Sequence, residues 1–309
     1  NLVSNYAGRG WEALMSVAFI PLYIRYLGPE AYGIIGLLAV IQSFMLILDF
    51  GMTPALTREA ARYRSGERNL AFLRDLVRSV ELAVGGLGAL IVLALALAAP
   101  AIATQWIRAQ ELPINTITTA LTIGGGLIAM RFFESIFRGT LFGLERQALC
   151  NGIGAASATI RGGGAALLVA LTDWGLPGFF AWQAAASLLT VVAMRGAVAL
   201  ALPAVGRPAR FSPAALRSVG RFALGMLAIS ILALIATQLD KVLLSRLLPL
   251  DEFGTYMFAA NVALALELAS APIMTTVYPR VVDLMARGDS QGLAKFFHRW
   301  ARVVTLLTA

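Results

Sequence analysis

The 309-residue chain is 59% hydrophobic and only 14% charged, and its mean hydropathy of +0.77 exceeds what a soluble domain can accommodate. Its formal charge of +8 is distributed in short clusters between apolar runs, which is typical of membrane topology and argues against a nucleic-acid partner. Because Cys150 and His298 are the only cysteine and histidine, the chain cannot assemble a disulfide framework, a Cys/His metal cluster or a Cys/His catalytic pair within itself.

Eight apolar runs and the start of a ninth divide the chain. A helix needs roughly 20 apolar residues to cross the ~30 Å hydrocarbon core of a bilayer, because each residue adds about 1.5 Å. Runs of this order cover residues 10–26, 31–48, 82–107, 112–130, 147–172, 174–194, 222–239 and 253–277, and the ninth begins at residue 303. Most are far longer than barrel strands, and isolated strands leave backbone groups unsatisfied in lipid. The sequence therefore predicts an all-α, polytopic transmembrane helix bundle.

The cations separate sharply between alternate loops. One set of loops holds 19 of the 25 lysines and arginines, whereas the other holds only Arg25, Arg108 and Arg246. Cytoplasmic loops are the ones enriched in lysine and arginine, which places the amino terminus inside and the turn at residues 28–30 outside. We therefore expect a multi-pass protein with a cytoplasmic amino terminus.

The basic stretch from Arg58 to Arg78 contains apolar residues at helical spacing. Leu70, Leu73 and Val77 share one face beside the arginines, which predicts an amphipathic helix on the cytoplasmic membrane surface. The alternative is a solvated hairpin that only sets the topology.

Two segments of the chain resemble each other at a distance of 221 residues. Residues 25–33 read RYLGPEAYG and residues 246–254 read RLLPLDEFG, and each segment forms an outward turn that leads into an apolar run. The offset is an even number of spans, so both copies would insert in the same orientation as parallel halves. The alternative is a chance recurrence of similar turns.

The repeat predicts two helical lobes. Residues 1–205 form the expected amino-terminal lobe of six spans. Residues 206–309 form a partial carboxy-terminal lobe of two spans and the start of a third. A complete second lobe would need three more spans, so we interpret the chain as a fragment.

Several motifs are similar to those of one transporter family. Residues 26–33 read YLGPEAYG, residues 49–51 read DFG and are followed by Arg58, and residues 238–241 read QLDK before the second turn. On the basis of these motifs, the chain resembles the Wzx-like oligosaccharide flippases of the polysaccharide biosynthesis family. The resemblance covers essentially the whole chain. That family belongs to the MOP exporter superfamily, which also contains the MATE drug exporters. The chain departs from the family at Pro249, where a glycine is frequent.

The resemblance implies a function without covalent chemistry or a cofactor. Such a flippase translocates undecaprenyl-pyrophosphate-linked oligosaccharide, for example the O-antigen repeat of lipopolysaccharide, across the bacterial inner membrane. It implies alternating access through a central cationic cavity between two lobes. The implied partners are this lipid-linked glycan, membrane lipids, a proton or sodium ion as the coupling ion, and other polysaccharide-assembly proteins.

Four cations are candidates for substrate binding, because a charge inside hydrocarbon needs water, a partner or a function. Arg161 lies near the middle of its span, before a triplet of glycines, and its guanidinium can pair bidentately with phosphate. Arg131 shares a helix face with Glu134 and Arg138. The candidates are Arg161, Arg131, Lys241 and Arg9, and the alternatives are structural ion pairs for the first three and positive-inside anchoring for Arg9.

Four carboxylates are candidates for coupling or gating. Glu267 interrupts the eighth span, and Asp240 precedes Lys241 in the seventh. Asp49 precedes Gly51 at the inner end of the second span, where a structural role as an acceptor of backbone N–H groups is favoured. The candidates are Glu267, Asp240, Glu134 and Asp49. No metal ligands and no catalytic residues are predicted.

Two other functions stay open from the sequence. A MATE-like drug or cation antiporter would favour an acidic cavity rather than a cationic one. A membrane-embedded glycan polymerase or ligase typically carries a large outward loop, whereas the outward loops here are all short. The chain also lacks a recognisable set of nucleophile, base and orienting group, so we do not expect an enzyme.

Overall fold

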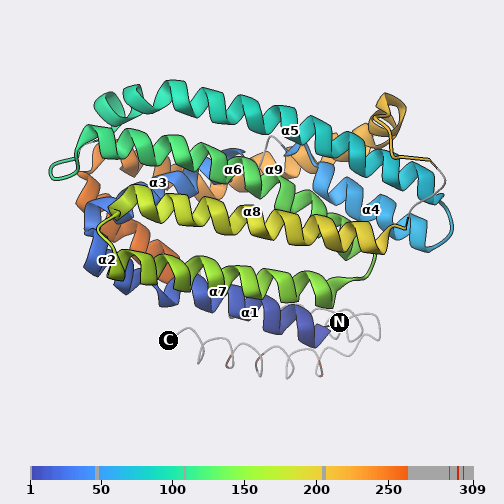
Figure 1. Ribbon diagram of the computed structural model, residues 1–309, viewed down its shortest axis with the longest axis horizontal. Coiled ribbons are helices and arrows are strands. Elements are labelled where there is room, and N and C mark those ends of the chain that lie inside the picture. Colours follow the sequence, from blue (N-terminus) through green and yellow to red (C-terminus); the bar gives the residue numbers. More distant parts are fainter. Residues whose placement is uncertain are drawn as a thin grey trace.

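The computed structural model describes residues 2–45, 49–107, 109–203 and 207–263, with single residues 292, 298 and 302, and without the side chains of residues 2–6, 9 and 45. Within these ranges the chain forms a bundle of long helices that lie side by side (Figure 1). The elements are α1 (Leu2–Ala18), α2 (Ile20–Leu27), α3 (Pro29–Met45), α4 (Met52–Arg64), α5 (Leu70–Ala101), η2 (Ile102–Trp106), α6 (Ile114–Gly143), α7 (Gln147–Leu171), α8 (Gly175–Ala201) and α9 (Pro213–Leu247). A further helix covers residues 250–263.

The predicted all-α membrane-spanning bundle is confirmed. Among the described residues, five helices are long and apolar enough to cross a bilayer, namely α5 continued by η2, then α6, α7, α8 and α9. They coincide with the third to seventh predicted spans. The helix at residues 250–263 overlaps the start of the eighth, and the remainder of that span and the ninth lie outside the described residues.

The first predicted span is a broken helix rather than a continuous one, whereas the second follows α3 and ends before the turn at Phe50 and Gly51. α1 ends before Phe19, and Pro21 lies in the first turn of α2, where a residue without an N–H group is tolerated. Between α3 and α4 the chain adopts left-handed conformations at Phe50 and Gly51. A Cβ atom on Gly51 would overlap the carbonyl group of Ala223 in α9, so only glycine permits this close approach.

The connections between helices lie at two opposite ends of the bundle. Figure 1 shows the connections after α4, α6 and α8 at the end where the chain starts, and those after α2, α5 and α7 at the other end. The first end carries the loops that are rich in arginine. The structure therefore matches the predicted sorting of the loops into a basic end and a cation-poor end.

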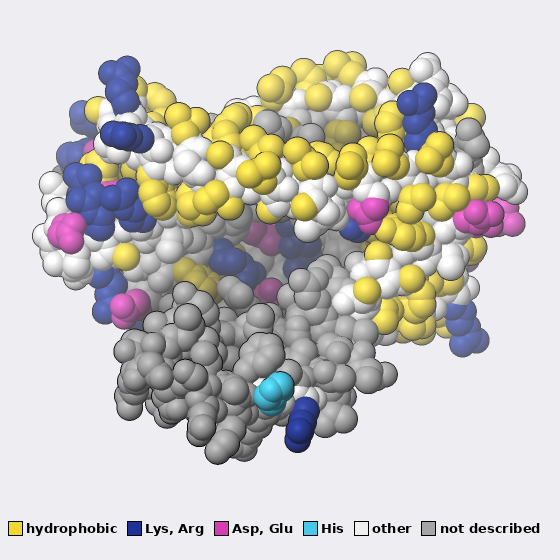
Figure 2. Space-filling view, turned by 180° about the vertical axis from the view of Figure 1, so that it is seen from behind, with side chains coloured by type: hydrophobic (Ala, Val, Ile, Leu, Met, Phe, Trp, Pro, Cys, Tyr) yellow, Lys and Arg dark blue, Asp and Glu magenta, His cyan; other side chains and the backbone are white. Residues whose placement is uncertain are grey.

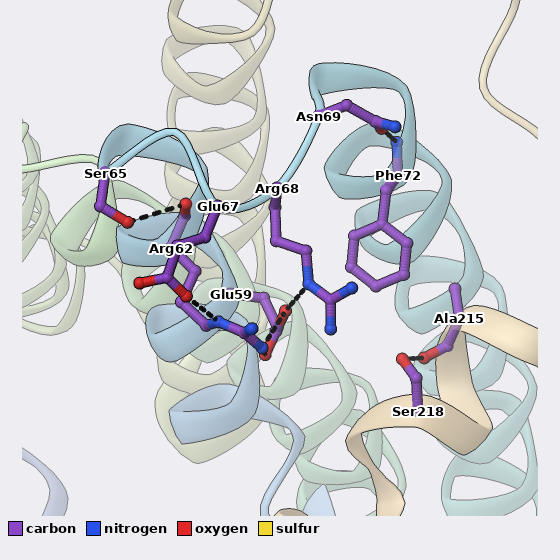
Figure 3. A network of polar contacts seen from close by, with 9 residues as sticks. All are labelled: Glu59, Arg62, Ser65, Glu67, Arg68, Asn69, Phe72, Ala215 and Ser218. Atoms are coloured by element: carbon purple, nitrogen blue, oxygen red, sulfur yellow. Dashed lines mark hydrogen bonds and ion pairs between the residues drawn. The ribbon is translucent and has the colours of Figure 1, made fainter.

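A buried carboxylate organises the basic hairpin between α4 and α5 (Figure 3). The side chain of Glu59 is 3% exposed and pairs with Arg62 at 3.1 Å and with Arg68 at 2.9 Å. Glu67 accepts a hydrogen bond from Arg62 at 2.9 Å, and this bond holds the pKa of the exposed Glu67 carboxyl below its usual range. The hairpin is thus tied together by one buried acceptor that serves two arginines.

The hairpin leads directly into α5 and not into a separate surface helix. The side-chain oxygen of Asn69 accepts a hydrogen bond from the backbone N–H group of Phe72 at 2.7 Å and so caps the start of α5. Leu73 and Val77, predicted to face the membrane surface, are buried inside the bundle as part of the first turns of α5. The predicted interfacial helix is therefore wrong, because the apolar face that suggested it packs against neighbouring helices.

Replacing Glu59 with glutamine is expected to lower the melting temperature of the protein in detergent by several degrees. The variant leaves Arg62 and Arg68 without their shared buried counter-ion. Glu67→Gln provides the matched control, because it removes an exposed partner of the same Arg62 and should change the melting temperature little. Equal melting temperatures for the two variants would contradict the central role of Glu59.

The two repeat segments contact each other at the cation-poor end of the bundle. A Cβ atom on Gly33 would lie 2.6 Å from the carbonyl oxygen of Leu250, and one on Gly254 would overlap the carbonyl oxygen of Pro29. Residues 29 and 33 occupy the same repeat positions as residues 250 and 254. In each contact, the glycine of one copy therefore packs against the carbonyl group at the other position of the opposite copy. Such reciprocity is what a two-fold relation between the copies requires. We call Pro29, Gly33, Leu250 and Gly254 the glycine seam; it favours the two-lobe interpretation, which stays a prediction.

Candidate functional site

A cavity of about 360 Å³ lies among α1, α2, α3, α6, α7, α8 and the helix at residues 250–263. Figure 2 shows cationic and acidic side chains within a hollow at the middle of one face of the molecule. Helices from both predicted lobes therefore contribute to one chamber. Its polar lining includes Glu12, Tyr32, Arg131, Arg161, Gln183 and Asn261.

Arg131 and Arg161 converge on this cavity from different helices. Arg131 of α6 donates to Glu134 Oε2 at 2.9 Å, one turn further along the same helix. The guanidinium of Arg161 on α7 approaches the same oxygen at 3.9 Å. The side chain of Glu134 is only 7% exposed, so one nearly buried carboxylate serves two arginines.

The polar groups of this cluster are incompletely satisfied. Glu134 Oε1, Arg131 Nε and Arg161 Nη1 are buried and have no hydrogen-bond partner among the residues that the structure describes. The separation of 3.9 Å between Arg161 and Glu134 is too long for a hydrogen bond. Two guanidinium groups therefore retain donors that an anion in the cavity could use.

A second ion pair, between Arg138 and the cavity residue Glu12, lies beside this cluster and leaves its net charge unchanged. Arg138 of α6 donates to Glu12 Oε1 of α1 at 3.2 Å, so Arg138 is paired across helices and does not simply extend to the membrane surface. Gly154 of α7 makes room for this pair, because a Cβ atom there would overlap the Glu12 carboxylate. Together the two clusters contain three arginines and two glutamates, a net formal charge of about +1 when all are ionised.

Replacing Gly154 with alanine is expected to destabilise the protein by about 1–3 kcal/mol, because the added methyl group forces the Glu12–Arg138 pair apart. Gly152→Ala is the matched control on the same helix, since no described atom lies within 4 Å of a Cβ atom at residue 152. Thermal unfolding in detergent measures both. A Gly154→Ala variant as stable as Gly152→Ala would show that the pair has room to rearrange.

Residues 1–285 match the family model described as polysaccharide biosynthesis protein. The chain belongs to the polysaccharide biosynthesis protein family. The match covers nearly the whole chain, including every helix that lines the cavity, so the predicted family is confirmed. A comparison with curated proteins found no match at a significant level.

This family member shares its fold with solved MATE transporters. One is the inward-facing conformation of a multidrug resistance MATE family transporter of the MOP superfamily, at 13% identity and a TM-score of 0.68, over 96% of this chain and 68% of the other. Another is the MATE multidrug transporter DinF-BH, at 15% identity and a TM-score of 0.70, over 99% of this chain and 70% of the other. A third similar structure, named protein A, has 13% identity and a TM-score of 0.74 over 91% of this chain, which spans 63% of that structure. At these identities the similarity establishes the fold alone.

The glycine triplet that follows Arg161 holds this part of the family member's site in place. The ring of Phe19 lies where a side chain on Gly162 would project, and the carbonyl oxygen of Gly162 accepts the hydroxyl group of Tyr23 at 2.9 Å. The indole ring of Trp182 covers Gly164, and its N–H group donates to a carbonyl in the turn before the triplet. Because the triplet has no side chains, Phe19 and Trp182 pack directly against its backbone, and this packing holds α7 at the cavity wall.

Lys241 and Asp240 lie on α9 and do not line this cavity. Lys241 donates to the carbonyl oxygen of Thr237 at 2.6 Å and approaches Asp240 at 3.6 Å. Asp240 also accepts the hydroxyl group of Tyr256. Each member of the pair therefore has a partner besides the other, and the structure does not bring Lys241 together with Arg131 and Arg161.

The remaining predicted site residues have different placements. Asp49 accepts hydrogen bonds from the backbone N–H group of Thr53 at 3.0 Å and from its hydroxyl group at 3.2 Å. It thus binds the first turn of α4, which is the structural role that the sequence favours for it. The backbone of Arg9 belongs to α1, but its side chain lies outside the described residues, as does the whole of Glu267. Their predicted roles stay predictions.

Several residues that line the cavity were not identified as site residues from the sequence, among them Glu12, Tyr32 and Asn261. Glu12 lies in the first span, and its charge inside an apolar run is a signal that could have found it. Tyr32 and Asn261 join the two repeat copies, because the Asn261 amide donates to the Tyr32 hydroxyl group at 2.9 Å. The amide of Asn261 within an apolar run is the corresponding signal, and Tyr32 belongs to the YLGPEAYG motif at residues 26–33.

Proposed function

We propose that this protein is a flippase that carries an oligosaccharide linked by pyrophosphate to undecaprenol across the bacterial inner membrane. The observation that carries the proposal is the convergence of Arg131 and Arg161 on one cavity with a single carboxylate between them. Buried guanidinium groups with unused donors suit a phosphate-containing cargo. Membership of a family described as polysaccharide biosynthesis proteins supports an oligosaccharide as the remainder of the cargo.

The charge of the cavity distinguishes this function from multidrug export. Two of the similar solved structures are multidrug transporters, but a cavity for cationic drugs needs a negative balance. Here the clusters around Glu134 and Glu12 contain one more arginine than glutamate. An anionic cargo therefore suits the cavity better than a cationic one.

The proposed mechanism is alternating access between two lobes, residues 1–205 and residues 206–309. The glycine seam and the hydrogen bond between Tyr32 and Asn261 close the cation-poor end of the cavity, which we assign to the outside. The basic end, with the amino terminus, faces the cytoplasm, where the cargo enters. The pyrophosphate and glycan cross through the cavity while the polyprenyl tail stays in lipid.

Coupling and partners form the finer part of the proposal. A proton or sodium ion drives the cycle, and Glu267, Asp240, Glu134 and Asp49 stay the candidate carboxylates for coupling or gating. Membrane lipids surround the bundle, and other polysaccharide-assembly proteins supply and consume the carried glycan. None of these steps requires a covalent intermediate.

Transport in reconstituted vesicles tests this function directly. The full-length protein is reconstituted with a fluorescently labelled, pyrophosphate-linked oligosaccharide, and the arrival of the label in the opposite leaflet is measured. We expect protein-dependent translocation of this cargo and none of a cationic dye. Export of the dye alone would favour the drug antiporter, and glycan joined into longer chains would favour a polymerase or ligase.

A further inference from the structure

The carboxylate of Glu134 lies between the two arginines that line the cavity. It contacts the guanidinium groups of both Arg131 and Arg161 through the single oxygen Oε2. Arg131 lies on the same helix, one turn away, whereas Arg161 belongs to a neighbouring helix. The carboxylate is thus the counter-ion that the two arginines share.

This internal counter-ion satisfies the arginines poorly. The contact with Arg131 is a hydrogen bond of 2.9 Å, but the contact with Arg161 is 3.9 Å. Arg161 Nη1, Arg131 Nε and Glu134 Oε1 are all left without partners among the described residues. An anion that bridges both arginines would therefore gain donors that Glu134 does not use, and the contact with Arg161 is the first to yield.

We propose that Glu134 is a charge-selective competitor: it admits dianionic pyrophosphate diesters to the arginine pair and excludes monoanionic phosphodiesters such as common anionic phospholipid headgroups. The inference rests on the proposed function and names the selectivity of the same cavity. A phosphodiester carries one negative charge and matches the carboxylate that it must replace. A pyrophosphate diester carries two charges and more acceptor oxygens, so it outcompetes the carboxylate.

Such selectivity answers a need that any lipid flippase faces. Phospholipids with a single negative charge are abundant in a bacterial membrane and would otherwise compete with the cargo for the arginine pair. Glu134 makes occupancy by these lipids unfavourable without blocking the rarer pyrophosphate-linked cargo. Without it, the cavity would bind anions with less discrimination.

Binding of two soluble probes to the full-length protein in neutral detergent tests the inference. One probe is a short prenyl chain joined by pyrophosphate to a sugar, and the other is a short-chain phosphatidylglycerol. We expect the wild-type protein to prefer the pyrophosphate probe by at least about tenfold. Glu134→Gln should narrow this preference by about tenfold or more, because affinity for the monoanionic probe rises most.

A matched control separates this effect from the loss of any bridging carboxylate. Glu81 of α5 pairs with Arg78 at 3.0 Å on its own helix and with Arg195 of α8 at 3.0 Å, but it does not line the cavity. Glu81→Gln removes the same charge from the same kind of cluster and should leave the probe preference at its wild-type value. A shift in Glu81→Gln as large as that in Glu134→Gln would overturn the inference.

The outcomes distinguish the inference from the function beneath it. If the wild-type protein binds neither probe, the proposed anionic cargo fails. If it binds the pyrophosphate probe and Glu134→Gln retains the full preference, the function stands and the role of Glu134 is overturned. If Glu134→Gln does not fold, Glu134→Asp replaces it, because the shorter side chain withdraws the carboxylate from Arg161. Glu134→Asp should narrow the preference for the pyrophosphate probe partly. An unchanged preference in Glu134→Asp would also overturn the inference.

Discussion

Replacing Arg161 with glutamine is expected to reduce translocation of the pyrophosphate-linked glycan by about a hundredfold or more, a loss of roughly 3 kcal/mol or more. The side chain of Arg161 is 15% exposed and lines the cavity, and its guanidinium group has an unused donor, so glutamine removes both charge and bidentate geometry. Initial rates in vesicles that contain equal amounts of folded protein measure the effect. Arg131→Gln should have a similar effect, because the two groups address the same anion.

Arg195→Gln is the matched control for this prediction. Arg195 also belongs to a cluster in which two arginines share a glutamate, but its side chain is 62% exposed and lies outside the cavity. Its replacement should leave transport within a few-fold of the wild-type rate. The double variant Arg131→Gln/Arg161→Gln should be little worse than either single one, because both act on one site. A wild-type rate of transport by Arg161→Gln would show that the arginine pair does not take part in transport.

Replacing Gly254 with leucine is expected to prevent closure of the outer end and to stop the transport cycle. The carbonyl oxygen of Pro29 and the backbone of Gly33 lie where the new side chain would project, so the seam must open by a side-chain diameter. The change can be detected with a cysteine introduced at Ile35, which lines the cavity. Cys150 is the only native cysteine and is buried, so the background is low.

A membrane-impermeant maleimide added from outside measures the opening. We expect it to label Ile35→Cys at least about tenfold faster in the Gly254→Leu background, because a wedge held in the seam shifts the equilibrium by more than about 1.4 kcal/mol. Gly196→Leu is the control, since no described atom lies within 4 Å of a Cβ atom at residue 196. Equal labelling in all three backgrounds would show that the seam is not the outer closure.

The long helices were predictable from the sequence because lipid imposes length and apolarity on each one directly. α5 to α9 contain the third to seventh predicted apolar runs, of which only the run in α7 is interrupted, by Arg161. The break at Phe19 was missed, since an apolar run reads as continuous whether or not the helix bends, although Pro21 marked the place. The end of the second run at residue 48, in contrast, agrees with the turn at Phe50 and Gly51, whose tight packing against α9 the sequence does not reveal.

The candidate site was predictable only in part. Arg131, Glu134 and Arg161 could be identified because charge within hydrocarbon needs a reason, but whether two helices bring them together is decided by packing. The same argument selected Lys241, which lies elsewhere and is paired locally. The pairing of Glu12 with Arg138 depends on a gap at Gly154 that no local pattern reveals. The equivalence of Gly33 and Gly254, in contrast, follows from the repeat, which aligns the two glycines.

The location of the bound pyrophosphate tests the central claim most directly. An electron cryomicroscopy structure of the full-length protein with a pyrophosphate-linked oligosaccharide would reveal it. We predict phosphate density between the guanidinium groups of Arg131 and Arg161, within about 3 Å of the unused donors of both. Phosphate density on another wall, with the Arg131–Glu134–Arg161 contacts unchanged, would contradict the account.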